Sequence, residues 1–314
     1  MPAPTPPSLE PTDATLEPWR DASETGPAAE PRNTLTPGLV LVATPIGNLA
    51  DISGRALDAL CDADLVLCED TRMSARLLGH YGIGTRTSPL HDHNEAARTP
   101  ALLDRIREGA RIVLVSDAGT PLMSDPGYRL VRAALEAGLA VSAIPGPNAA
   151  VMALVLSGLP PQPFLFLGFP PPRSAARLAA FGQLRAAEQA GLSATLLWHE
   201  APHRLAETLA DLATAFGDRP AAVARELTKR FEEVRRGALS ELVAHYAAHE
   251  ARGEITLVVG PPEDSTPDAA DLDAQLRRAM QGNSLKDAAA LVATATGLPR
   301  KTVYKRALEL AEAD

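Results

Sequence analysis

Short apolar runs alternate with helical patterns through most of this 314-residue chain, and this alternation limits the folds that it can adopt. Apolar runs without polar alternation are typical of strands that are buried on both faces of a sheet, with helices covering those faces. The sequence therefore predicts an α/β fold. The predicted strands are residues 39–43, 63–67, 111–115, 140–144, 164–168, 194–198, 221–225 and 254–259.

Two proline-rich segments bound the α/β part. Residues 1–37 contain nine prolines and few large apolar side chains, so they cannot bury enough surface to offset the entropy of ordering and are predicted to be disordered. Residues 261–271 are rich in Pro and Asp and are predicted to form a linker. Between these segments we expect two α/β halves, residues 38–150 and 151–260, and after them a small all-α tail, residues 272–314.

The tail has the pattern of a helix-turn-helix. Its apolar spacing predicts one helix before Gly297 and a second helix that begins after Pro299. A helical hairpin with solvated lysines is the alternative interpretation. Basic residues on the second helix are candidates for contacts with RNA phosphates. These candidates are Arg300, Lys301, Lys305 and Arg306.

Polar or Gly/Pro-rich loops follow four of the predicted strands, and the longest is SDAGTPLMSDPG, residues 116–127. Carboxyl ends of parallel strands meet at one edge of a sheet, so these loops predict a pocket built largely from backbone. Gly119 would let the backbone approach a ligand, and Asp125 is predicted to cap the next helix, with Pro126 as its first residue. A tight turn around Asp117 is the alternative. The sequence contains neither a P-loop nor a dinucleotide-binding fingerprint.

Composition argues against several classes of protein. The net charge of −9 disfavours loose binding of polyanions and leaves a local basic patch as the means of binding RNA. No apolar run reaches about 18 residues, and no basic stretch precedes an apolar one at the N-terminus, so we expect neither a membrane span nor a secretory signal. Two cysteines, Cys61 and Cys68, provide no disulfide framework. We therefore expect a cytoplasmic protein.

A series of longer motifs carries a resemblance to a known family. In chain order they are TPIGNLADIS, CEDTR, HDHNE, VSDAGTPLMSDPGY, IPGPNA, SGLP, HEAPHR, RELTKRFEE and GEITLVVG. Together they resemble the tetrapyrrole (corrin/porphyrin) methylase superfamily and, within it, the ribosomal small-subunit methyltransferase I family, over about residues 39–260. One departure is Ala201, which follows Glu200 where the family usually has Ser or Thr.

The resemblance implies an S-adenosylmethionine-dependent enzyme that 2′-O-methylates a cytidine of 16S rRNA in the 30S subunit. It also implies a homodimer and two α/β halves with the cofactor in the cleft between them. A sulfonium and an ammonium group need nearby oxygen atoms, which Asp117 and loop carbonyls can supply. The cofactor-binding residues implied by the resemblance are Pro45, Ile46, Ser116, Asp117, Ala118, Gly119, Met123, Ser124, Ala149, Phe169 and Glu254.

The substrate side calls for groups that orient a ribose hydroxyl and take its proton. The candidate catalytic residues are Asp70, Arg72, His93, Glu95, Glu226 and Lys229. The HDHNE motif also permits a metal site, but no Cys or third His lies near it in sequence, so we expect no metal. A polar surface turn is the alternative for HDHNE, and a solvated strand face is the alternative for residues 225–236.

Two other functions share parts of this pattern. A tetrapyrrole C-methyltransferase would keep the cofactor loops but would need an apolar planar groove and no basic tail. A non-enzymatic regulator that senses a ligand would use the tail to bind DNA, for which one helix-turn-helix per chain usually requires a dimer. The tail and the CEDTR and HDHNE motifs favour RNA methylation over both.

Overall fold

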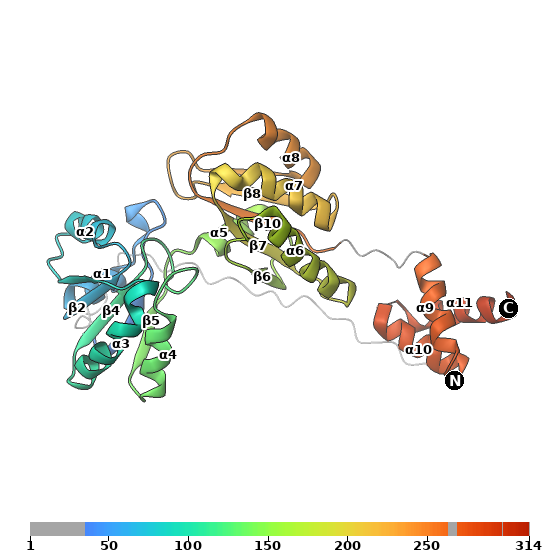
Figure 1. Cartoon of the computed structure of the whole chain (residues 1–314), viewed down its shortest axis with the longest axis horizontal. Coiled ribbons are helices and arrows are strands. Elements are labelled where there is room, and N and C mark those ends of the chain that lie inside the picture. The colour runs from blue at the N-terminus through green and yellow to red at the C-terminus, as the bar shows by residue number, and fades with distance from the viewer. Residues whose placement is uncertain (1–34, 263–268, 297, 314) are drawn as a thin grey trace, which may run out of the picture.

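The computed structural model describes residues 35–262, 269–296 and 298–313. Most of the segment predicted to be disordered, most of the predicted linker and the predicted turn at Gly297 lie outside the described residues. The described residues form two α/β halves, followed along the chain by a body of three helices (Figure 1). No helix in the described part is long and apolar enough to cross a membrane.

The first half is built on a five-stranded sheet in the order β3-β2-β4-β1-β5, and every pair in it is parallel. Its three central strands, β2, β4 and β1, are apolar on both faces because helices cover both. One face packs against Leu60 and Leu78 of α1 and α2, and the other packs against Leu102 and Leu130 of α3 and α4. The elements are β1 (Gly38–Val42), η1 (Leu49–Asp51), α1 (Gly54–Asp62), β2 (Leu65–Cys68), α2 (Thr71–His80), β3 (Thr87–Pro89), α3 (Asp92–Arg107), β4 (Arg111–Val115), α4 (Tyr128–Glu136) and β5 (Val141–Ile144).

The second half has a five-stranded sheet in the order β6-β7-β10-β8-β9, in which only β6 and β7 are parallel. Helices α6, α7 and α8 cover one face through Phe181, Leu209 and Leu242. Helix α5 covers the other face through Ala153 and Leu154. The elements are α5 (Ala149–Ser157), β6 (Phe164–Phe166), α6 (Ser174–Gln189), β7 (Thr195–Glu200), η2 (Pro202–Arg204), α7 (Leu205–Phe216), β8 (Pro220–Arg225), β9 (Glu233–Ala238), α8 (Leu239–Ala248) and β10 (Ile255–Val259).

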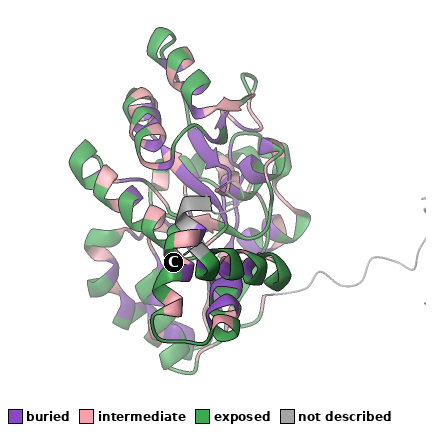
Figure 2. Ribbon diagram, turned by 90° about the vertical axis from the view of Figure 1, so that its right-hand side faces the viewer, coloured by how far each residue is buried: buried purple, intermediate pink, exposed green. Residues whose placement is uncertain are grey.

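Burial follows this layering. In Figure 2 the strands are purple in the middle of the α/β part, and the helices around them carry green outer faces. Helix α5 packs on the second sheet, so we group it with the second half. A buried ion pair joins α6 to α7, where Arg177 Nε donates to Asp211 Oδ2 at 2.7 Å.

The tail forms its own small core. Helices α9 (Ala269–Met280), α10 (Leu285–Thr296) and α11 (Arg300–Ala313) pack around Leu276, Val292 and Val303. The start of α11 directly after Pro299 agrees with the predicted second helix. Helix α9 was not predicted, although Leu272, Leu276 and Met280 follow one another at helical spacing.

Candidate active site

A cavity of about 370 Å³ lies between the two halves. The first half contributes the loops that follow β1 and β4, and the second half contributes the start of α5 and the ends of β7, β8 and β10. Apolar groups and four acidic side chains meet in its wall. The lining residues are Ile46, Asp117, Ala118, Met123, Ser124, Asp125, Ala149, Phe169, His199, Glu200, Ala201, Pro202, Ala224, Leu227, Gly253, Glu254, Ile255 and Thr256.

A second cavity, of about 640 Å³, adjoins the first. The two cavities share a wall, because Ile46, Asp117, Ala118 and Glu254 line both of them. The remaining lining residues of the second cavity are Thr44, Pro45, Gly47, Leu49, Met73, Arg76, Leu77, His80 and Lys229. Most of these come from helix α2 and from the loop that follows β1.

Two loops of the first half are bonded to each other where they enter the cavities. Thr44 and Gly119 exchange backbone hydrogen bonds of 2.9 and 3.0 Å. The φ of Gly119 is +83°, and a Cβ at this position would lie 3.2 Å from Ile46 Cγ2. This positive φ favours glycine, and Ile46 leaves little room for a larger side chain at this position. Gly119 lines a small recess beside the first cavity.

Ser116 and Asp117 shape the loop after β4. The buried Ser116 hydroxyl donates to the Gly119 carbonyl at 3.1 Å, so this side chain holds the turn and lies outside the lining of both cavities. Asp117 Oδ1 accepts the backbone N–H of Asp70 at 3.0 Å and thereby joins the loops after β2 and β4. Asp117 is consequently held at the wall that the two cavities share.

Asp125 does not have the predicted role. The N-cap of α4 is Gly127, with a φ of 119°, so Asp125 and Pro126 precede the helix instead of capping and starting it. The side chain of Asp125 lines the first cavity. Burial and the nearby carboxylates of Glu69 and Asp117 raise the pKa of Asp125 to about 6. Sequence reasoning missed this residue because Asp-Pro before an apolar run is a common helix start.

Glu95 is also used differently from the prediction. It is only 2% exposed, and its Oε1 accepts the backbone N–H of Leu130 at 2.9 Å. Glu95 therefore caps the first turn of α4 from the neighbouring helix α3, and its buried carboxylate is not available to a substrate. The candidate role of Glu95 in catalysis is accordingly wrong. His93, by contrast, is exposed on the first turn of α3, with its ring 5.9 Å from that of His91.

Asp70 and Arg72 form a pair at the start of α2. Asp70 caps the helix by accepting the Arg72 N–H at 2.8 Å, and Arg72 Nη2 donates to Asp70 Oδ2 at 2.6 Å. The hydrogen bonds from Arg72 lower the pKa of Asp70 to about 2. Asp70 therefore stays ionised near neutral pH. Neither residue lines the two cavities, although both follow β2 at the same edge of the sheet.

Lys229 connects the two halves at the second cavity. Its Nζ donates to Glu226 Oε1 at 2.8 Å and contacts Glu254 Oε2 at 3.1 Å. Its aliphatic chain lies against Gly47, where a Cβ would clash with it. Burial disfavours the charged lysine, but hydrogen bonds to both carboxylates outweigh that effect and raise the pKa of Lys229. Lys229 is therefore a fixed cation near the shared wall, and Glu226 helps to hold it there.

His199 was missed by the sequence reasoning. It lies on β7, where its Nδ1 is 3.1 Å from Thr256 Oγ1 and its ring contacts Phe166 and Phe169 at 4.8 and 5.6 Å. Burial lowers the pKa of His199, so the ring is neutral at neutral pH. The signal that could have indicated His199 is a polar residue at the end of an apolar strand.

Most of the predicted cofactor-binding residues come together at the first cavity. Outside its lining are Pro45, which lines the second cavity, and the loop residues Ser116 and Gly119. The residues that line the first cavity are Ile46, Asp117, Ala118, Met123, Ser124, Ala149, Phe169 and Glu254. Ala201 and Glu200 of the HEAPHR motif also line it, and Glu200 accepts the Thr208 hydroxyl at 2.5 Å.

The candidate RNA-binding residues of α11 differ in their surroundings. Arg300, Lys301 and Lys305 are exposed. Arg306 is engaged within the tail, because its Nε and Nη2 donate to Asp273 at 2.7 and 2.6 Å. Arg306 therefore ties α11 to α9. Within the described residues, no group of three or more His, Cys, Asp or Glu side chains is arranged to hold a metal ion.

The fold and the shared cleft define the class of protein. Residues 38–243 match the family of Tetrapyrrole (Corrin/Porphyrin) Methylases, and residues 266–311 match the RsmI C-terminal HTH domain. A solved diphthine synthase shares the fold, with TM-score 0.55 and 18% identity, covering 71% of this chain and 89% of that chain. The methyltransferase CobJ gives TM-score 0.54 and 18% identity, covering 71% and 94%. The chain belongs to the tetrapyrrole methylase family.

More similar relatives narrow the family further. A Mesorhizobium japonicum protein is 48% identical over 89% of this chain and 94% of its own length. A protein of Escherichia coli O157:H7 is 44% identical over 86% of this chain and 94% of its own length. Both are named ribosomal RNA small subunit methyltransferase I. Within the tetrapyrrole methylases, the chain is a member of the ribosomal RNA small subunit methyltransferase I family.

Proposed function

We propose that this chain is an S-adenosylmethionine-dependent enzyme that 2′-O-methylates the ribose of a cytidine in 16S rRNA of the 30S subunit. The observation that carries the proposal is the wall shared by the two cavities. A methyl donor in one cavity and a nucleoside in the other would meet at Asp117, Ala118 and Glu254. Relatives at 44–48% identity named for ribosomal RNA support this substrate over a tetrapyrrole and over a DNA-binding regulator. The cytoplasm, where ribosomal RNA is processed in bacteria, is then the place of action.

The first cavity suits the chemistry of S-adenosylmethionine. Ile46, Ala149 and Leu227 offer apolar surface for an adenine ring. Asp117 and Asp125 offer carboxylates to a ligand that carries a sulfonium and an ammonium group. Bound there, the cofactor supplies an electrophilic methyl group for transfer to an oxygen nucleophile. The residues present fit the group without any metal.

The chain's own residues would align the hydroxyl and keep water out. Transfer of a methyl group is an in-line displacement, so alignment and an enclosed site are the main contributions of a protein. Lys229 is fixed near the shared wall and would orient the ribose-phosphate, with Glu226 holding it in place. A carboxylate at the shared wall, from Asp117 or Glu254, would take the proton of the hydroxyl. Asp70, Arg72 and His93 would contact RNA nearer the rim.

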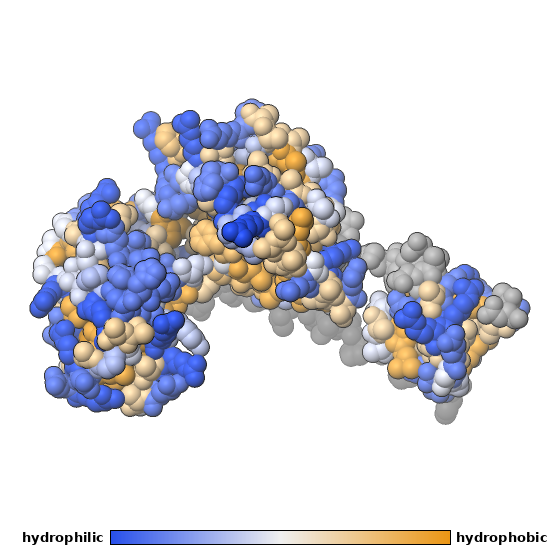
Figure 3. Space-filling model, viewed as in Figure 1, coloured by the Kyte–Doolittle hydropathy of each residue, from blue (hydrophilic) through white to orange (hydrophobic). Residues whose placement is uncertain are grey.

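Two further surfaces complete the proposal. Arg300, Lys301 and Lys305 would hold rRNA phosphates on the exposed face of α11. A second copy of the chain would cover α5, which is apolar all round yet leaves Val155 66% and Val151 46% exposed. Figure 3 shows apolar surface, in orange and tan, where α5 lies between the two halves.

The test is methyl transfer from labelled S-adenosylmethionine to 30S subunits, to free 16S rRNA and to a corrinoid, each offered separately. We expect label in 2′-O-methylcytidine, found in nuclease-resistant dinucleotides of the rRNA. Asp117→Ala should abolish labelling of every substrate, which controls for contaminating activity. Label in a base or in the corrinoid, with none on ribose, would refute the proposed substrate while leaving a methyltransferase.

A further inference from the structure

The second cavity has a wall made by one face of α2. Met73, Arg76, Leu77 and His80 are spaced three and four residues apart, so they lie on the same side of the helix. The opposite wall is the loop after β1, which contributes Leu49. Leu49 lies in the TPIGNLADIS motif, whereas Arg76 and His80 belong to none of the motifs that the sequence analysis attached to the cofactor or the substrate.

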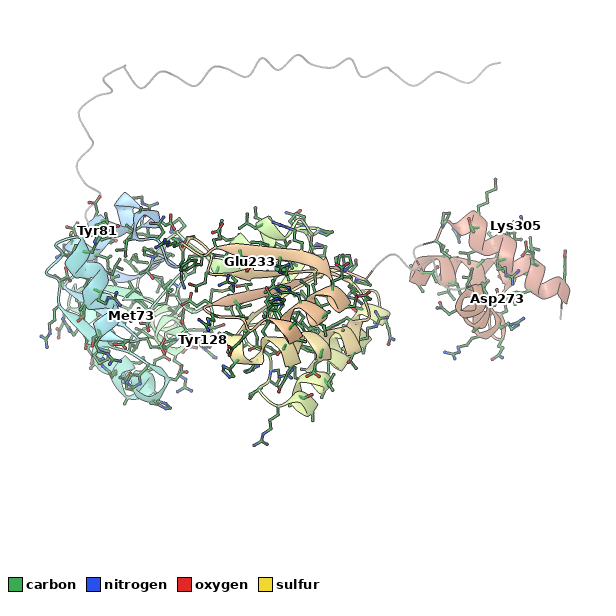
Figure 4. All side chains as sticks on the ribbon, turned by 90° about the horizontal axis from the view of Figure 1, so that it is seen from above. Met73, Tyr81, Tyr128, Glu233, Asp273 and Lys305 are labelled. Carbon is green, nitrogen blue, oxygen red and sulfur yellow. The ribbon has the colours of Figure 1, made fainter. Side chains whose placement is uncertain are left out.

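Two large apolar side chains are exposed within this cavity. Met73 of α2 is 45% exposed, and Leu49 of the loop after β1 is 39% exposed. The hydroxyl of Tyr81, just after α2, donates to the Leu49 carbonyl at 2.5 Å and holds the loop against the helix. Figure 4 shows Met73 and Tyr81 in the first half, in the region of α2. A flat, partly apolar ring would cover both side chains.

Cationic groups lie in the same cavity. Arg76 is exposed and forms no ion pair within the described part of the chain, so its guanidinium is available to a phosphate. Lys229 is a second cation, held against Glu254 of the wall shared with the first cavity, and His80, one turn further along the same face of α2, adds a ring N–H donor. The cavity thus offers apolar walls for a ring and cations for a phosphate, which is the recognition chemistry of a nucleotide.

The geometry also bears on the state of that nucleotide. A ribose hydroxyl must reach the shared wall at Asp117 and Ala118 to meet the first cavity. A base that covers Leu49 and Met73 in the second cavity would no longer stack on its neighbours in the RNA. Enzymes that act on one nucleotide of a structured nucleic acid commonly take it out of its stack, at a cost of a few kcal/mol.

We propose that the second cavity binds one RNA nucleotide that has left its base stack, with the base between Leu49 and Met73 and the phosphate on Arg76 and His80. This inference rests on the proposed function and names how its substrate is held. The base is covered by the exposed apolar side chains, and the ribose lies at the shared wall. Arg76 and Met73 act on the RNA and leave the methyl donor untouched.

The test uses 30S subunits whose 16S rRNA carries 2-aminopurine directly 3′ to the cytidine that the enzyme is proposed to methylate. S-adenosylhomocysteine fills the first cavity so that no turnover occurs. Fluorescence of 2-aminopurine should rise on addition of the full-length chain, because its neighbour no longer stacks on it. Met73→Ala and Arg76→Ala should reduce the rise, and each should lower kcat/KM for 30S subunits about ten- to a hundredfold. Calorimetry should show their affinity for S-adenosylmethionine unchanged.

Arg107→Ala is the matched control. Arg107 is an exposed arginine in the last turn of α3. This turn leads into the amino end of β4, whereas the cavities lie at the carboxyl ends of the strands. Its loss should change neither the fluorescence nor kcat/KM. If the wild-type chain methylates 30S subunits but the fluorescence does not change, the proposal that the nucleotide leaves its base stack is refuted, and the proposed function stands. Absence of ribose methylation in wild type would instead remove the proposed function itself. Equal loss in the Arg76 and Arg107 variants would show a general charge effect and overturn the site.

Discussion

The affinity for S-adenosylmethionine should depend on pH through Asp125. Burial, Glu69 and Asp117 raise the pKa of this carboxyl to about 6, and Asp125 lines the cavity proposed for a cationic cofactor. A bound cation favours the ionised carboxylate, so binding is coupled to release of the proton. With a pKa near 6, the ionised fraction is about 10% at pH 5 and about 90% at pH 7. The dissociation constant should therefore fall about tenfold over this range.

Stability should move in the opposite direction. A carboxyl whose pKa is raised on folding binds its proton more tightly in the folded state than in the unfolded state. Its contribution to stability is therefore most favourable below the unfolded pKa of about 4, and is lost as pH rises through about 6. The shift from 3.8 to about 6 sets an upper limit of about 3 kcal/mol, and the partial exposure of Asp125 reduces it. Asp125→Asn should therefore raise the melting temperature at pH 7 while weakening cofactor binding.

Calorimetric titration at pH 5, 6 and 7 and constant ionic strength measures the effect, with Asp125→Asn beside the wild type. The variant is needed because His199 also lines the cavity, and protonation of its ring at low pH would repel a cation in the same sense. We expect the pH dependence to be lost in the variant. If Asp125→Asn keeps the tenfold change, another group is responsible; if wild-type affinity is flat, the cofactor does not contact this carboxylate.

Three further outcomes follow from particular contacts. Asp117→Ala should lower the affinity for S-adenosylmethionine at least about tenfold, as measured by calorimetry, because the change removes a carboxylate and leaves the Asp70 N–H without its acceptor. Gly119→Val should lower the free energy of unfolding by about 2–3 kcal/mol in urea titration, since a branched side chain at φ +83° also meets Ile46. Deletion of residues 268–314 should preserve cofactor affinity and cooperative unfolding of the α/β part, but weaken 30S binding in filter assays at physiological salt; loss of cooperativity would place the tail in the core.

The fold was predictable where a strand is both apolar and buried on two faces. Residues 111–115 show this most clearly, since the strand predicted from RIVLV is β4 at the centre of the first sheet. Strand β3 escaped prediction because three residues, Thr-Ser-Pro, carry no periodicity. The direction of the strands in the second sheet was not predictable for another reason. Strands β8 and β10 are as apolar as parallel strands, but they pair antiparallel. Apolarity reports burial and does not report direction.

The site was predictable in its loops and less so in its side chains. The loops after β1, β4 and β5 meet because parallel strands deliver their carboxyl ends to one edge. The use of a single polar residue depends on contacts between distant segments. Glu95 stands in a polar motif, yet it caps α4, 35 residues further along the chain. Asp125 stands in a motif typical of caps, yet it faces the cavity. Neither use is visible from local sequence.

The concentration of carboxylates at the first cavity makes physical sense only with a cationic partner. Asp117, Asp125 and Glu254 line one small space, and Glu69 lies close enough to raise the pKa of Asp125. Like charges held together destabilise a fold, and a site of this kind persists when its function requires it. Lys229 compensates Glu254 from the second cavity. Asp117 in the shared wall and Asp125 in the first cavity form no ion pair within the described residues, and the cationic methyl donor that we propose for this cavity would compensate their charge.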